Sequence, residues 1–440
     1  MENSQHMIKV LDQLDTRLIR RATIGLFLTQ SIASAALLAS TTVNPLVISG
    51  LSGQDALAGL PSALMLGGAS LAAYPAGRMM GRLGRRYGLL IGCVIAISGG
   101  VICGFSVAVG ALIPFLIGLM FLGAGRGTLD QARYAAAELN PPDRRGRALS
   151  SVIFGGTIGA VLGPAMVAPA SGIAASFGVA PLAGPFFATA VLIVIAGLVI
   201  FVLLSMDIKG IAARVIGLHT ANNPTPATQT QKPEEPGVAK RAALMELLTN
   251  RNARVAMFTM ISAQATMVMM MAIVSLHMTH HNHDLGEVSL VTSGHVLGMF
   301  AFAPLIGQLA DRIGRRLMII VSAIIIAAGC VVAPLSLMTP WIGLALFLIG
   351  LGWSGCYITG STLLTDAFAL KDRARLQGAN EVMVNIASAV GSLSSGILLQ
   401  AFGYNIVSAI GLMVALLPLL VIVFSRPTGL RQEPHIVQAQ

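Results

Sequence analysis

Twelve apolar runs, each long enough to cross a lipid bilayer, follow one another through this chain. A helix needs about twenty apolar residues to span roughly 30 Å of hydrocarbon. The runs lie near residues 22–48, 56–76, 88–109, 111–137, 147–170, 180–205, 252–278, 288–310, 317–338, 340–365, 376–401 and 403–424. Only 10% of the residues are charged, against roughly 25% in soluble proteins. The pattern predicts an all-α membrane protein with twelve transmembrane helices in contact with the lipid bilayer.

The runs form two groups of six, separated by a stretch rich in proline, asparagine and glutamate. Such a stretch cannot bury enough apolar surface to fold alone, so it is expected to be a linker. The predicted organisation is an N-terminal tail (1–21), a six-helix bundle (22–205), a linker (206–251), a second six-helix bundle (252–425) and a C-terminal tail (426–440).

The position of the basic residues predicts the orientation in the membrane, because Lys and Arg concentrate on the cytoplasmic side. With the N-terminus placed inside, 26 of the 28 basic residues fall in the tails, the linker, the even-numbered loops or the first residues of the runs that follow them. We therefore expect a multi-pass protein of a bacterial inner membrane with both termini in the cytoplasm. The net charge of +10 is explained by this asymmetry, and no nucleic-acid partner is needed.

A basic turn occurs twice, each time after the second apolar run of its half. The first copy contains Gly77, Arg82, Gly84, Arg85 and Arg86, and the second contains Gly307, Arg312, Gly314, Arg315 and Arg316 at the same offsets. Recurrence of one motif at equivalent places in two halves indicates internal duplication. Two pseudo-symmetric bundles are therefore predicted.

The turn resembles the signature G-x-x-x-D-R-x-G-R-R of the major facilitator superfamily, and the resemblance covers residues 20–425. It implies a transporter that works by alternating access and acts as a monomer. It also implies a latch, a charge pair that forms in one conformation and breaks in the other, made by Asp311, Arg315 and Asp366. Gly81 replaces the acidic residue in the first copy, where Glu138 would be the matching partner. Alternatively, these arginines only fix the topology.

The fifth apolar run carries Gly159, Gly163 and Pro164. This spacing is similar to the G-x-x-x-G-P motif of the proton-coupled antiporters of the superfamily, which implies the branch of bacterial drug and metabolite antiporters. Val167 and Ala168 depart from its usual continuation. Close helix packing is an equal interpretation, because small residues four apart let helices approach.

Three charged residues lie in the fourth run: Arg126, Asp130 and Arg133. Spacings of four and three put them on one helical face. A charge at bilayer depth costs about 3 kcal/mol or more, so charged residues there face a wet cavity or a partner. We predict that they line the path of the substrate and of protons. The alternative is a self-neutralising cluster that closes the cytoplasmic side, which suits Arg133 best.

Proton coupling needs a carboxylate that can become neutral, and Asp130 and Glu381 are the candidates. For Glu381 the alternative is an interfacial pair with Arg375. Further residues are predicted to line the cavity, and the two aromatic ones could stack on a planar ligand. They are Gln30 and Asn44 in the first run, Gln264 in the seventh, and Trp353 and Tyr357 in the tenth.

The predicted function is secondary transport of a small organic solute, coupled to protons and directed outward. The alternatives are an uptake carrier for a metabolite or vitamin, and a sensor that does not transport. No nucleotide-binding loop is present, so ATP drive is not expected. No cofactor, metal site or enzymatic activity is predicted. The imidazoles at the outside end of the seventh run (His277, His280, His281 and His283) are expected to be a solvated tract rather than a metal site.

Overall fold

The computed structural model is all-helical and describes residues 2–140, 145–204, 245–368 and 370–424. Twelve helices within these ranges are long and apolar enough to cross a membrane, which confirms the predicted fold class. Most of the expected linker and the whole C-terminal tail lie outside the described residues.

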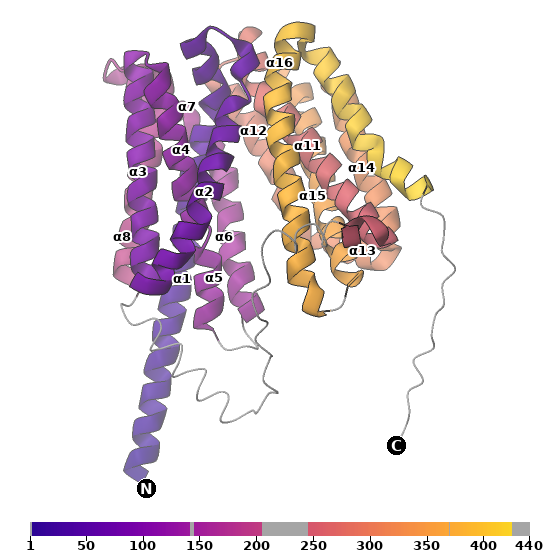
Figure 1. The fold of residues 1–440 in the computed structure, drawn as a ribbon. Helices are drawn as coiled ribbons and strands as arrows, with labels where there is room; N and C mark the ends of the chain where they lie inside the picture. The colour runs from indigo at the N-terminus through magenta and orange to yellow at the C-terminus, as the bar shows by residue number, and fades with distance from the viewer. Residues whose placement is uncertain (1, 141–144, 205–244, 369, 425–440) are drawn as a thin grey trace, which may run out of the picture.

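The first half consists of α1 (Glu2–Ser52), η1 (Asp55–Leu57), α2 (Leu60–Leu83), α3 (Arg85–Val109), α4 (Leu112–Leu129), α5 (Ala132–Leu139), α6 (Arg145–Ala165), α7 (Val167–Ser176), η2 (Pro181–Ala183) and α8 (Gly184–Leu203). The second half consists of α11 (Arg251–His280), α12 (Leu285–Phe300), α13 (Ala303–Ile313), α14 (Arg315–Val332), α15 (Thr339–Asp366) and α16 (Leu370–Phe424). Each half forms its own bundle, and the two bundles stand side by side (Figure 1). Gly403, with φ 76°, divides α16 into the last two spans.

Three of the predicted spans are interrupted. The fifth breaks at Met166 after Pro164, and the eighth breaks before Pro304, because a proline ring cannot donate the helical hydrogen bond. The fourth breaks after Leu129, where the Gln131 amide bonds to the Thr128 carbonyl in a tighter turn. Arg133, predicted to lie in the same helix as Arg126, therefore belongs to the separate helix α5.

The duplicated turns have the same backbone in both bundles. Gly84 has φ 90° and ψ 161°, and Gly314 has φ 89° and ψ 147°. Only glycine adopts such angles without strain. These turns mark one end of the molecule, which we call the arginine end; in Figure 1 it is the lower end, where α1 begins.

The glycines of the fifth span pack α6 against α1. A Cβ added at Gly159 would lie 1.8 Å from the carbonyl oxygen of Ser31, and one added at Gly163 would lie 2.6 Å from that of Ala35. Both contacts are with backbone atoms, which cannot move aside as a flexible side chain can. The spacing is thus used for helix packing inside the first bundle.

Gly159→Ala is expected to lower the melting temperature of the purified protein clearly. Forcing a methyl group into a closely packed interface costs about 1–3 kcal/mol. Gly172→Ala in α7 is the matched control, because nothing lies within 4 Å of a Cβ at Gly172. Equal melting temperatures for the two variants would contradict the packing role.

At the end opposite the arginines, which we call the closed end, the two bundles touch. The Ala56 amide of η1 donates to Gln400 Oε1 at 2.8 Å, and the Ser392 hydroxyl of α16 donates to the Gly59 carbonyl at 2.9 Å. The imidazole of His280 lies 3.7 Å from the Asp55 carboxylate. The buried side chains of Leu46, Ala58 and Leu276 pack together beside these contacts. Access between the bundles is therefore blocked at this end.

Candidate functional site

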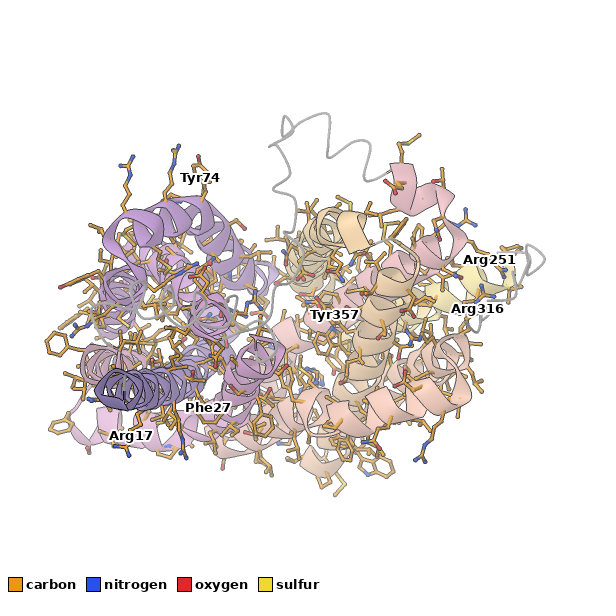
Figure 2. The ribbon with its side chains drawn as sticks, turned by 90° about the horizontal axis from the view of Figure 1, so that it is seen from below. Arg17, Phe27, Tyr74, Arg251, Arg316 and Tyr357 are labelled. Atoms are coloured by element: carbon orange, nitrogen blue, oxygen red, sulfur yellow. The ribbon has the colours of Figure 1, made fainter. Side chains whose placement is uncertain are left out.

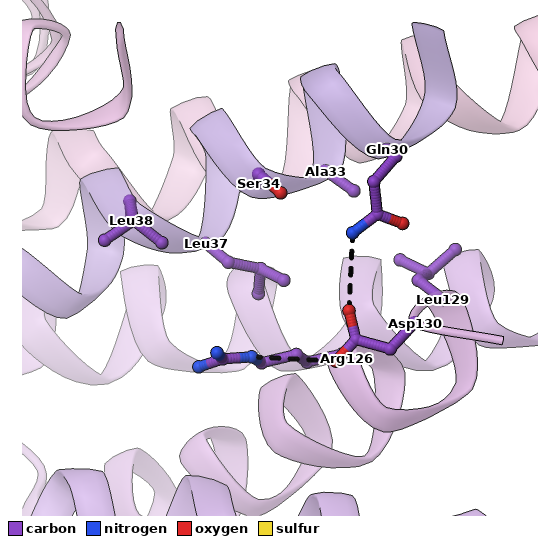
Figure 3. Close-up of a pocket in the computed structure, with 8 residues that line it drawn as sticks. All are labelled: Gln30, Ala33, Ser34, Leu37, Leu38, Arg126, Leu129 and Asp130. Atoms are coloured by element: carbon purple, nitrogen blue, oxygen red, sulfur yellow. Dashed lines mark hydrogen bonds and ion pairs between the residues drawn. The ribbon is translucent and has the colours of Figure 1, made fainter. Parts of the chain in front are cut away.

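On the side of the first bundle, the candidate site is built by α1 and α4. Gln30 Nε2 lies 3.4 Å from Asp130 Oδ1, and Arg126 Nε lies 4.0 Å from Asp130 Oδ2 (Figure 3). These three residues line a small hollow of about 50 Å³, together with Ser34 and neighbouring apolar side chains. The sequence-predicted residues Gln30, Arg126 and Asp130 are thus brought together.

Both charged side chains of this group remain accessible. The side chain of Arg126 is 49% exposed and that of Asp130 is 44% exposed. Charges at this depth would be costly against lipid, so the space they face is taken to be aqueous. Because the bundles meet at the closed end, this space opens toward the arginine end.

On the side of the second bundle, hydrogen bonds link three helices. The Trp353 indole of α15 donates to Gln264 Oε1 of α11 at 2.7 Å. The Gln264 amide donates to the Ser388 hydroxyl of α16 at 2.9 Å, and Ser388 donates to the Val384 carbonyl at 3.1 Å. This chain of uncharged groups fixes the orientation of the indole ring.

One turn further along α15, Tyr357 stacks on Trp353. The ring centroids are 5.0 Å apart and the ring planes differ by 24°. We call this pair of rings the aromatic platform. The Tyr357 hydroxyl donates to Glu381 Oε2 at 2.9 Å, and the charge of Arg133 in α5 acts on Tyr357 from the other bundle. Figure 2, seen from the arginine end, places Tyr357 between the two bundles.

The structure also places two further sequence-predicted residues, Asn44 and Glu381. Asn44 is 1% exposed and its amide lies 3.5 Å from Met65 Sδ, so it is not among the residues that line the hollow beside Asp130. Glu381 accepts from Tyr357, while the side chain of Arg375, its proposed partner, lies outside the described residues. Ser388 was not predicted, although Glu381, Asn385 and Ser388 recur at helical spacing and this pattern could have revealed it.

The basic turns form equivalent charge pairs in the two bundles. Arg315 pairs with Asp366 and lies 3.5 Å from Asp311. Arg85 pairs with Glu138 in the same way, even though Gly81 replaces the acidic residue of that copy. In this conformation each pair lies within a single bundle and joins the basic turn to the arginine end of α15 or α5.

The last arginine of each turn binds another helix. Arg86 Nη2 donates to the Phe201 carbonyl at 2.7 Å, and Arg316 Nη2 donates to Asn252 Oδ1 at 2.9 Å. Arg82 and Arg312 are exposed at the turns. A Cβ at Gly77 or Gly307 would meet nothing within 4 Å, so the structure shows no close approach that requires glycine at these two positions.

The fold and the duplicated turns agree with a comparison of the whole sequence. The sequence profile of the Major Facilitator Superfamily matches residues 26–274 and 255–438. The chain belongs to the major facilitator superfamily. Two transporters of this superfamily type from Bacillus subtilis match 93% and 91% of the chain, so the similarity covers both bundles.

Three proteins similar to this superfamily member are informative, two by sequence and one by structure. It is 35% identical to the uncharacterized transporter YdeG of Bacillus subtilis, over 93% of each chain. It is 25% identical to the riboflavin transporter RfnT of Brucella anthropi, over 95% of this chain and 99% of that one. Among solved structures, the inward open xylose transporter XylE of Escherichia coli superposes with a TM-score of 0.62 at 16% identity, covering 93% of this chain and 96% of that chain. The chain is a multi-pass secondary transporter and not an enzyme.

Proposed function

We propose that this transporter exports a small planar organic solute across a bacterial inner membrane in exchange for protons. The observation that carries the proposal is the aromatic platform, Trp353 and Tyr357, on which the charge of Arg133 acts from the first bundle. Arg126 and Asp130 supply exposed charges on the side of the first bundle. Large aromatic side chains bind flat rings by stacking, and arginines attract anionic or electron-rich groups.

The solute class has support from a relative as well as from the geometry. RfnT is named as a riboflavin transporter, and riboflavin is a planar heteroaromatic molecule with many hydrogen-bonding groups. The Trp353 and Tyr357 rings suit the flat part of such a molecule. Gln30 and Arg126 supply hydrogen-bond donors for its polar groups.

Proton coupling is supported by two carboxylates that reach the aqueous space, Asp130 and Glu381. The membrane potential contributes about 2.3 kcal/mol per 100 mV for each charge moved. In the proposed orientation the arginine end faces the cytoplasm, together with both termini, and the site opens to the cytoplasm in this conformation. The pairs of Arg85 with Glu138 and of Arg315 with Asp366 each lie within one bundle. We propose that they exchange partners when the arginine ends of the two bundles come together, as the bundles rock about a midplane site.

The second candidate function is uptake of the same class of solute together with protons. The similarity to a riboflavin transporter supports the solute class for both candidates. The two differ only in the sign of the coupling, so one experiment separates them.

Proteoliposomes holding the purified chain should accumulate radiolabelled riboflavin, or a related planar solute, when their lumen is more acidic than the bath. Outward proton flow then drives solute inward by exchange. Accumulation only with the reversed gradient would establish symport instead. An uncoupler is the control, since it should abolish accumulation in either case. Preference for non-aromatic solutes, or transport that ignores the gradient, would refute the proposal.

A further inference from the structure

We propose that Glu381 is the proton-binding residue of this transporter and that Tyr357 transmits its protonation to the aromatic platform. This inference rests on the proposed function, because it names the residues through which protons would act on the solute. It assigns the proton to one of the two candidate carboxylates on the basis of what each of them touches.

The two rings of the platform are held by different kinds of hydrogen bond. Trp353 is tied to α16 through the amide of Gln264 and the hydroxyl of Ser388, none of which titrates. Tyr357 is tied to the same helix by its bond of 2.9 Å to the carboxylate of Glu381. Protonation of Glu381 can therefore weaken the hydrogen bond that holds Tyr357, while the hydrogen bond that holds Trp353 stays unchanged.

The other carboxylate lacks such a connection. Asp130 contacts Gln30 at 3.4 Å and Arg126 at 4.0 Å, and both partners belong to its own bundle. Neither contact reaches an aromatic ring. Protonation of Asp130 would change the charge of the hollow, but its contacts with Gln30 and Arg126 do not lead to the platform.

Among the described residues, the groups near Glu381 on the neighbouring helices include no second carboxylate in contact with Tyr357. From α15 the facing group is Tyr357, and from the opposite bundle the charge of Arg133 acts on that same hydroxyl. At Asn380, the residue before Glu381, the facing group from α11 is the uncharged thioether of Met260. The one acidic residue of α15, all of which is described, is Asp366, and it pairs with Arg315.

The direction of the effect follows from the strength of the hydrogen bond. A hydroxyl that donates to an ionised carboxylate forms a bond about twice as strong as one between neutral groups. Ionised Glu381 thus holds Tyr357 against Trp353, and protonated Glu381 releases it. A solute that needs the assembled platform binds the deprotonated form, and by reciprocity its binding expels the proton. Mutually exclusive binding of this kind produces exchange.

The chain offers an intrinsic probe, since its two tryptophans are Trp341 and Trp353. In a Trp341→Phe protein, fluorescence reports on Trp353 alone, without any need to know the solute. We expect its emission to change with pH in a single one-proton transition as Tyr357 leaves the indole. Glu381→Gln and Tyr357→Phe should each remove this transition, and Asp130→Asn should retain it.

Each outcome decides the assignment. Persistence of the transition in Glu381→Gln, or its loss in Asp130→Asn but not in Glu381→Gln, would overturn it. Because Glu381→Gln could fold poorly, Tyr357→Phe gives an independent reading in which the carboxylate is kept. The fluorescence experiment is separate from the proteoliposome assay, so failure of the riboflavin-class proposal would leave its result standing, and the converse also holds.

Discussion

Gly59→Val is expected to abolish transport, lowering the initial rate by about 100-fold or more. In the closed end, a Cβ at Gly59 would lie 1.6 Å from the carbonyl oxygen of Ser392 in the opposite bundle. No rotamer change relieves a clash with backbone, so the bundles cannot close at this end while valine is present. Alternating access requires both ends to open and close in turn, and the variant should stay open at the closed end.

The matched control lies in the helix that Gly59 precedes. Gly67→Val in α2 adds the same side chain where a Cβ meets nothing within 4 Å, and transport should stay near that of the unaltered protein. Initial rates in proteoliposomes measure both variants. A Gly59→Val protein that transports as well as Gly67→Val would show that the contact with Ser392 is not used in the cycle.

Cysteine labelling can measure directly whether Gly59→Val holds the protein in a conformation that is open at the closed end. The four native cysteines are buried, so they provide a low background. Leu276→Cys places a thiol in the apolar cluster of the closed end, where Leu276 is 3% exposed. A charged maleimide should react slowly with this thiol in the unaltered background and rapidly when Gly59→Val is added. Equal rates would contradict the trapped state.

The periodicity of apolar residues predicted the fold because lipid imposes one strong rule, which is that a spanning segment must be a helix of about twenty residues. The duplicated turn carried a second, equally local signal, and Gly84 and Gly314 do share one backbone conformation. The candidate charged residues of the site could also be predicted locally, because a charged residue such as Arg126 is conspicuous within an apolar run. Each of these features can be read from a single short segment of sequence.

Features that depend on contacts between distant segments could not be read in this way. The bond between Ala56 and Gln400 joins residues 344 positions apart, and no local pattern pairs them. The break after Leu129 occurs without proline or glycine at that point, so it left no signal and Arg133 was assigned to the wrong helix. The bond between Tyr357 and Glu381 likewise depends on how α15 and α16 pack, and no local pattern predicts it.

Arg126→Ala is expected to weaken binding of a riboflavin-class solute by roughly ten- to a hundredfold, the loss that corresponds to one hydrogen bond to a charged group. Thermal stabilisation of the purified protein by riboflavin measures this without a transport assay. The smaller riboflavin-induced rise in melting temperature should be accompanied by a loss of transport. The reason is that the side chain of Arg126 is 49% exposed, in the space that the solute would enter.

The double variant separates contact with the solute from charge balance. If Arg126 only neutralises Asp130, at 4.0 Å in the structure, then Asp130→Asn should restore binding to Arg126→Ala, because no unpaired charge remains. If Arg126 binds the solute itself, the double variant should stay as weak as Arg126→Ala alone. The non-additivity of the two substitutions therefore reports on the role of the arginine. We expect no rescue, and a double variant that binds like the unaltered protein would reduce Arg126 and Asp130 to a self-neutralising pair beside the path.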